Sequence, residues 1–213
     1  MLTVEQIQQH FIEGLNGAVR RPGMYGGELG LFYKFDEVVY VTETGAGRTW
    51  QEALEAAGAW SSIGVAGVVR RLMPGDGAEA MASAYADYAH QQGWLRIDRT
   101  LDGRDYADLR GRLAGYCATD HLEADVLGSF GEPSVRIGGS NPRYPSVLGY
   151  VAADGPIVWF YLWNGSKPDE PDSWPLYEEP VLLAGRCGLA PFKESFVFTP
   201  EGQVWRSQML GST

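Results

Sequence analysis

The hydrophobic pattern of this chain changes once, at Gly131 and Pro133, and that change limits the folds open to it. Before it, apolar residues recur three and four apart, the spacing of amphipathic helices. From Ser134 onward they form short β-branched or aromatic runs separated by turn residues, which is typical of hairpins in an antiparallel sheet. Helices first and strands afterwards predict an α+β fold, with a helical N-terminal half packed against a C-terminal antiparallel β-sheet. The regions are 1–119, mainly helical, and 120–213, a short helix plus sheet, forming either two units or one continuous domain.

Local signals place the boundaries of the expected elements. Thr3 and Gln6 form a capping-box pattern that opens the first helix. The segment 35–41 fits either a helix or a strand, and three glycines predict a break within the helical region 49–72. Strands are expected at 135–137, 147–151, 157–162, 181–183, 196–198 and 204–205, with a turn at 200–202 before the last.

Composition narrows the classes of function. The chain has 27 acidic and 17 basic residues, for a net charge of -10. This argues against nucleic-acid binding, which needs a basic surface to displace counterions, and suits a basic protein partner. The N-terminus lacks the pattern of a secretory signal, and no apolar run is long enough to span a bilayer. We therefore expect a cytoplasmic protein without membrane contact, and we expect no cofactor.

The stretch 19–27, VRRPGMYGG, resembles the start of the type II topoisomerase and gyrase-like ATPases, in which an arginine-flanked RPGMYIG turn follows a helix. Membership would imply an asparagine on the next helix to hold magnesium, then a DxGxG-type nucleotide loop and a glycine-rich lid. Here that helix has no asparagine, and no downstream loop continues the nucleotide pattern, so an ATPase is not predicted. The motif is interpreted as a turn in which Gly23 permits a positive φ while Met24 and Tyr25 pack on the core.

Cys117 and His121 are the candidate catalytic residues, because a spacing of four on a continuous helix places a thiolate and an imidazole on one face. The same pair would suit zinc. A helix boundary at Thr119 and Asp120 argues against both roles, as does the lack of the PCxxC motif that zinc deaminases need. The simpler interpretation is a buried structural cysteine and a surface histidine, so no metal site is predicted.

The linker-like segment 164–175 is bordered by aromatic and acidic side chains. On the strand before it, Trp159, Tyr161 and Trp163 alternate and share one face, which is either core or partly exposed. If exposed, such aromatic residues with an acidic rim would suit a basic protein. The candidate partner-binding residues are Trp163, Asp169, Glu170, Trp174, Tyr177, Glu178 and Glu179.

The organisation of residues 120–206, a short helix ending FGEPSVRIGG and then a sheet with aromatic strands, resembles bacterial toxin-immunity proteins. The resemblance lies in organisation and acidity. It implies a non-enzymatic antitoxin-type protein that binds one basic toxin and blocks its active site. The alternative is an enzyme or small-molecule binder with a site between the helical half and the sheet, using Cys117, His121 and either Arg136 or Arg143. A scaffold or regulatory subunit is a third interpretation.

Overall fold

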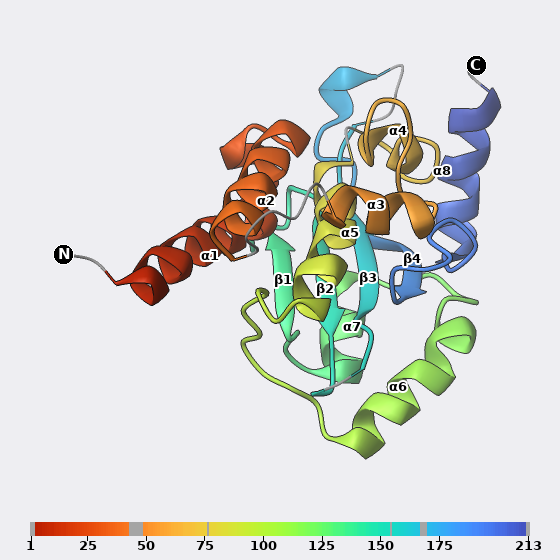
Figure 1. The fold of residues 1–213 in the computed structure, drawn as a ribbon. Helices are drawn as coiled ribbons and strands as arrows, with labels where there is room; N and C mark the ends of the chain where they lie inside the picture. The colour runs from red at the N-terminus through yellow and green to blue at the C-terminus, as the bar shows by residue number, and fades with distance from the viewer. Residues whose placement is uncertain (1–2, 43–48, 76, 154, 167–169, 212–213) are drawn as a thin grey trace.

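The computed structural model describes residues 3–42, 49–75, 77–153, 155–166 and 170–211 (Figure 1). The α+β prediction is confirmed, because in the described residues seven α-helices precede an antiparallel sheet and one α-helix follows it. The helices are α1 (Val4–Arg20), α2 (Glu28–Thr42), α3 (Thr49–Ala56), α4 (Ala66–Val69), α5 (Ala78–Gln91), α6 (Gly103–Tyr116), α7 (Glu123–Phe130) and α8 (Pro200–Gly211). The strands are β1 (Val135–Gly138), β2 (Ser146–Tyr150), β3 (Val158–Trp163), β4 (Val181–Cys187) and β5 (Val197–Phe198).

The sheet is a meander in which each strand pairs antiparallel with the next, in the order β1-β2-β3-β4-β5. In the register of β2 against β3, Gly149 lies opposite Trp159, and the ladder of β3 against β4 is irregular between Tyr161 and Leu162. A side chain at Gly149 would overlap the Trp159 ring, so glycine is needed at that position. Every residue of β2 and β3 is buried.

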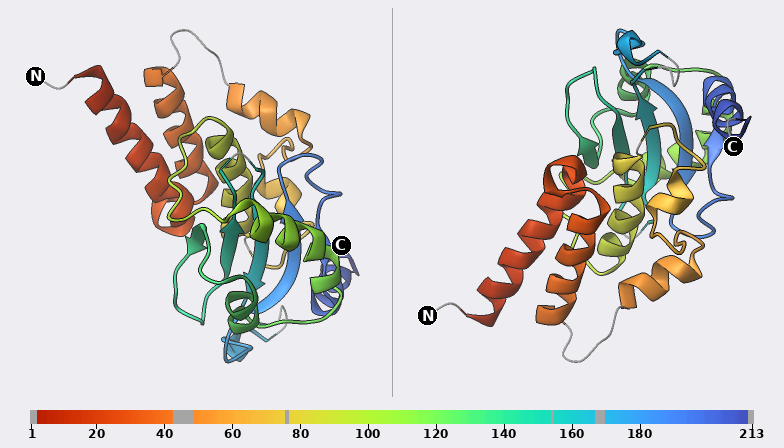
Figure 2. Two further views of the ribbon diagram at one scale, coloured as in Figure 1. Left: turned by 90° about the horizontal axis from the view of Figure 1, so that it is seen from below. Right: turned by 90° about the horizontal axis from the view of Figure 1, so that it is seen from above.

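Burial on both faces makes the sheet the middle layer of the molecule. Trp159, Tyr161 and Trp163 lie in the hydrophobic cluster formed with α1 to α5, which places this aromatic face in the core. The alternate residues Phe160 and Leu162 lie in a second cluster with α6 and α7. The two sets of helices therefore cover opposite faces of the sheet (Figure 2).

Helix α5 is the central helix of the first layer, and it is buried along most of its length. Its sequence, AEAMASAYADYAHQ, is rich in alanine, which allows other elements to approach closely on several sides. It contacts α1, α2, α3, α4, β1 and β2. Helix α5 thus fixes the N-terminal helices to the sheet.

The VRRPGMYGG stretch forms a short 3-10 helix, Pro22–Tyr25, between α1 and α2. The positive φ angles belong to Gly26 (86°) and Gly27 (68°), so the expectation for Gly23 is wrong. Met24 is 76% exposed and does not pack on the core as expected. The predicted capping box of Thr3 and Gln6 is present at the start of α1. The VRRPGMYGG stretch serves as the turn between α1 and α2, which form a helical hairpin that extends away from the sheet (Figure 2).

Three further segments test what the sequence predicts. Residues 35–41 are helical within α2, and the expected break lies between α3 and α4. The strand expected at 204–205 is wrong, because this segment belongs to α8. Pro200 stands at the first position of α8, and the Thr199 hydroxyl accepts from Gly202 N (3.1 Å), so the expected turn is a helix start. Each helix of the described residues is too short or too polar to span a membrane.

Candidate functional site

Two loops at one end of the sheet are joined by the buried side chain of Asn164, which directly follows β3. Its Nδ2 donates to the carbonyl oxygens of Pro142 (2.9 Å) and Tyr177 (2.9 Å), and its Oδ1 accepts from Tyr177 N (3.1 Å). The side chain is 1% exposed, so these bonds are shielded from water. Asn164 therefore holds the β1–β2 loop and the β3–β4 loop in one arrangement, a role the sequence analysis missed.

An exposed aromatic pair lies on these joined loops. Tyr144 on the β1–β2 loop is 51% exposed, and Trp174 on the β3–β4 loop is 41% exposed. Their ring centroids are 5.4 Å apart with planes tilted by 51°, and the Arg143 guanidinium lies 6.0 Å from the Trp174 ring. Large rigid rings that remain exposed are the side chains most often found at the energetic centre of protein interfaces. Tyr144 was not among the predicted residues, because only the fold brings it next to Trp174.

The predicted residues nearest the sheet are less accessible. Trp163 is 6% exposed and packs against Trp205, with ring centroids 4.3 Å apart, so it belongs to the core. Tyr177 is half-buried, and its hydroxyl donates to Glu201 Oε1 (2.5 Å). Burial and the nearby Glu201 carboxylate raise the pKa of Tyr177 to about 12. Asp169 lies outside the described residues.

The three remaining acidic candidates differ in their surroundings. Glu170 and Glu178 are exposed, whereas Glu179 is half-buried. The Glu179 carboxylate accepts from Ala124 N (3.2 Å) in the first turn of α7, where negative charge stabilises a helix. We refer to Tyr144, Glu170, Trp174 and Glu178 as the Trp174 surface. Glu179 is excluded from it because its carboxylate has this structural contact.

Cys117 and His121 do not share a helix face, because α6 ends at Tyr116 and α7 begins only at Glu123. Cys117 is 1% exposed, and burial raises the pKa of its thiol to about 11. The His121 ring stacks on Tyr116, with centroids 3.8 Å apart, and its Nε2 lies 2.9 Å from the Tyr116 carbonyl oxygen. Among the described residues no cluster of three His, Cys, Asp or Glu side chains could hold a metal ion. The expectation of a helix boundary between the two candidates is confirmed.

The two arginines that an enzyme or small-molecule binder was expected to use also contact other groups and not Cys117. Arg136 pairs with Glu123 (2.5 Å), whereas Arg143 lies over Trp174. The structure therefore does not gather these side chains into one catalytic group.

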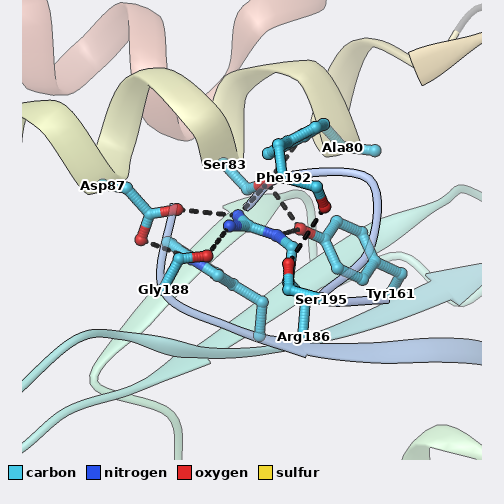
Figure 3. Close-up of polar contacts among 9 residues, drawn as sticks. Ala80, Ser83, Asp87, Tyr161, Arg186, Gly188, Phe192 and Ser195 are labelled. Carbon is cyan, nitrogen blue, oxygen red and sulfur yellow. Dashed lines mark hydrogen bonds and ion pairs between the residues drawn. The ribbon is translucent and has the colours of Figure 1, made fainter. Parts of the chain in front are cut away.

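A different polar cluster does lie between the helical half and the sheet, centred on Arg186 of β4 (Figure 3). The arginine is fully buried, and its Nη2 forms an ion pair with Asp87 Oδ2 of α5 (2.8 Å). Nε donates to the Tyr161 hydroxyl (2.7 Å), Nη2 to Ser83 Oγ (3.2 Å), and Nη1 to the Gly188 carbonyl. These contacts engage all three guanidinium nitrogens.

Aromatic rings complete this cluster. Trp159 Nε1 donates to Asp87 Oδ1 (2.9 Å), and the Phe192 ring lies 4.7 Å from the Arg186 guanidinium in a cation–π contact. Desolvation raises the pKa of Asp87, and the Arg186 charge and the Trp159 hydrogen bond oppose that effect. The cluster joins α5 to the sheet and fixes the Asp87 carboxylate at the end of the helix. Neither charged residue was among the predicted site residues, although an arginine in the apolar run VLLAGRC was an available signal.

No family model matches the chain, and searches of the curated proteins and of the solved structures found no match either.

Proposed function

We propose that the chain is a cytoplasmic protein-binding protein of the immunity type, which captures and blocks a basic toxin-like partner through the Trp174 surface. Three features support this proposal. The net charge of -10 favours a basic partner, and the resemblance in organisation to toxin-immunity proteins supplies the class. The loops that carry the surface are joined before any partner binds, which lowers the entropy cost of association.

The observation that carries the proposal is the exposure of Trp174 and Tyr144 on loops that Asn164 holds together. A tryptophan ring that is 41% exposed leaves apolar area in water, and a partner would remove that area. Glu170 and Glu178 are exposed on the β3–β4 loop that carries Trp174 and add negative charge to it, whereas the Arg143 guanidinium lies 6.0 Å from the Trp174 ring. This combination of a central aromatic group and a charged rim is the usual anatomy of a protein interface.

Affinity capture with wild-type protein from the source cells, followed by titration of the purified pair, tests the assignment of the surface. Trp174→Ala should weaken the affinity by about tenfold or more, as for a central aromatic residue. Tyr40→Ala is the matched control, because Tyr40 is an 85% exposed aromatic residue on α2. Equal affinities for the wild type and Trp174→Ala would remove this surface from the interface.

The charge part of the proposal has its own test. Glu178→Lys should slow association and reduce its dependence on salt, because rim charges act mainly on the encounter of the two proteins. Glu194→Lys serves as the control, since this exposed residue lies beyond the opposite end of β4. Identical association rates for the two variants would show that the acidic rim does not steer the partner.

A further inference from the structure

A cavity of about 360 Å³ opens at the C-terminal end of α5, away from the Trp174 surface. One wall consists of Asp87, His90 and Gln91, which lie on a single face of the helix because they are spaced three and four apart. Ala153, the turn at 155–157 and residues 188–189 form the other walls. This volume lies in the range of pockets that hold small organic molecules.

Three of the polar groups of the residues that line the cavity are hydrogen-bond acceptors. The Asp87 carboxylate is 97% buried, and it keeps its position through Arg186 and Trp159. The Gly155 carbonyl lies 3.1 Å from His90 Nε2, and the Gly188 carbonyl accepts from Arg186, which leaves each oxygen a second lone pair. These groups favour a ligand that donates hydrogen bonds.

The electrostatics of the cavity favour a cation. The Asp87–Arg186 pair is neutral as a whole, but Asp87 lines the cavity and Arg186 is not among the lining residues, so the negative end of the pair is the nearer one. The C-terminal end of a helix also carries partial negative charge, and α5 ends at Gln91. None of the described lining residues is a lysine or an arginine.

We propose that this cavity is a binding site for a compact organic cation, such as an amidinium, guanidinium or ammonium compound with a small apolar body. The cationic group would donate to Asp87 and to the carbonyl oxygens of Gly155 and Gly188. The apolar body would pack on Pro156, Ile157 and Leu189, which supply the hydrophobic part of the wall. The site is independent of the partner surface, so either can exist without the other.

Benzamidine and benzamide provide a matched pair of probes, because they are nearly equal in shape and only benzamidine is charged. The Trp159 indole N–H donates to Asp87 and therefore reports on changes at that carboxylate. In ¹H–¹⁵N spectra of the full chain, benzamidine should shift the Trp159 indole signal in a saturable way at millimolar concentration, as expected for a ligand of this size. Benzamide should shift it much less.

Two neighbouring substitutions separate a site from general attraction to an acidic protein. Gln91→Lys places a positive charge at the cavity wall, whereas Gln92→Lys places the same charge on an exposed residue that does not line it. Gln91→Lys should weaken benzamidine binding about fivefold, as for like charges a few ångströms apart near a surface. Gln92→Lys should change it by less than about twofold, because exposed charges are screened.

Three results would overturn the proposal. The first is equal shifts from benzamidine and benzamide. The second is a benzamidine response at other signals while the Trp159 indole signal stays fixed. The third is equal weakening by Gln91→Lys and Gln92→Lys. None of these results bears on the Trp174 surface, because the titrations contain no protein partner.

Discussion

At the residue scale, the most costly feature of the core is the buried charge of Asp87 and Arg186. Removing two charges from water costs several kcal/mol per ion, and a buried pair often stabilises a fold no more than apolar residues would. The pair here is surrounded by donors and acceptors, including Ser83, Tyr161 and the Gly188 carbonyl. Such a pair orients α5 against the sheet and places a carboxylate at the cavity wall.

Replacing one member of the Asp87–Arg186 pair should destabilise the fold far more than replacing both members. Asp87→Leu or Arg186→Met alone should lower the free energy of unfolding by about 3–5 kcal/mol, because each leaves an uncompensated buried charge. The double variant should lose much less than the sum of the two. Urea denaturation of the three variants measures this coupling. If the loss of stability in the double variant equalled the sum of the two single losses, the two charges would not be coupled.

The Cys117 thiol gives a pH-dependent prediction. Burial raises the pKa of Cys117 from its ordinary value near 9 to about 11 in the folded protein. The pKa of the thiol is higher in the folded than in the unfolded chain. Its contribution to the free energy of unfolding is therefore fully present below pH 9 and is lost as the pH rises to 11.

The test compares the wild type with Cys117→Ala, so that other titrating groups cancel. The stability difference between the two proteins should shrink by about 2 kcal/mol between pH 8 and pH 11. Denaturation curves collected across this range supply the difference. A stability difference between the two proteins that stays constant with pH would mean that the thiol is not buried as described.

At the scale of elements, Asn164 is the residue that turns two loops into one surface. Asn164→Ala should cost about 2–3 kcal/mol, since it leaves buried backbone groups unpaired. It should also speed hydrogen exchange at the Tyr177 amide, which donates to the Asn164 side chain. Asn16→Ala is a matched control, because Asn16 is a buried asparagine with three comparable bonds elsewhere.

The two asparagine variants should therefore lose similar stability but differ at one amide. Native-state hydrogen exchange resolved by residue provides the comparison. If Asn16→Ala accelerated Tyr177 exchange as much as Asn164→Ala, the effect would be global loosening and not the release of the two loops.

The elements themselves show how far local sequence information extends. The Thr3 capping box and the strands of the meander could be predicted, because periodicity and turn residues are local signals. Helix α8 was missed because the segment Pro200–Gly202 suits both a turn and a helix start. The Thr199 hydroxyl and the close fit of Gly202 against the Leu183 carbonyl make it a helix.

The site was less predictable than the elements, for a physical reason. Trp174 and Glu178 could be proposed from composition, whereas Tyr144 becomes the neighbour of Trp174 only after β2 pairs with β3. The contact between Asp87 and Arg186 joins a helix to a strand that lies far away in the sequence. Single-sequence patterns carry no information about such pairs, because both partners occur in segments whose local pattern is apolar.

At the scale of the whole molecule, the helical half and the sheet are interleaved. Helix α6 belongs to the first 119 residues, yet it covers the face of the sheet opposite to α5, and a side chain at Gly185 of β4 would overlap Leu113 of α6. We therefore predict one cooperative unfolding transition. Tryptophan fluorescence and far-UV circular dichroism should give the same urea midpoint, and two separated midpoints would contradict this expectation.

If the Trp174 surface binds and blocks a basic toxin-like protein, the chain should protect cells that produce that protein. The most direct measurement is the growth of host cells that produce the captured partner together with either the wild type or the Tyr144→Ala/Trp174→Ala double variant. We predict that the wild type restores growth and that the double variant, produced at the same folded level, does not. Equal protection by both proteins would contradict the assignment of this surface, and growth inhibition that the wild type cannot relieve would contradict the proposed function.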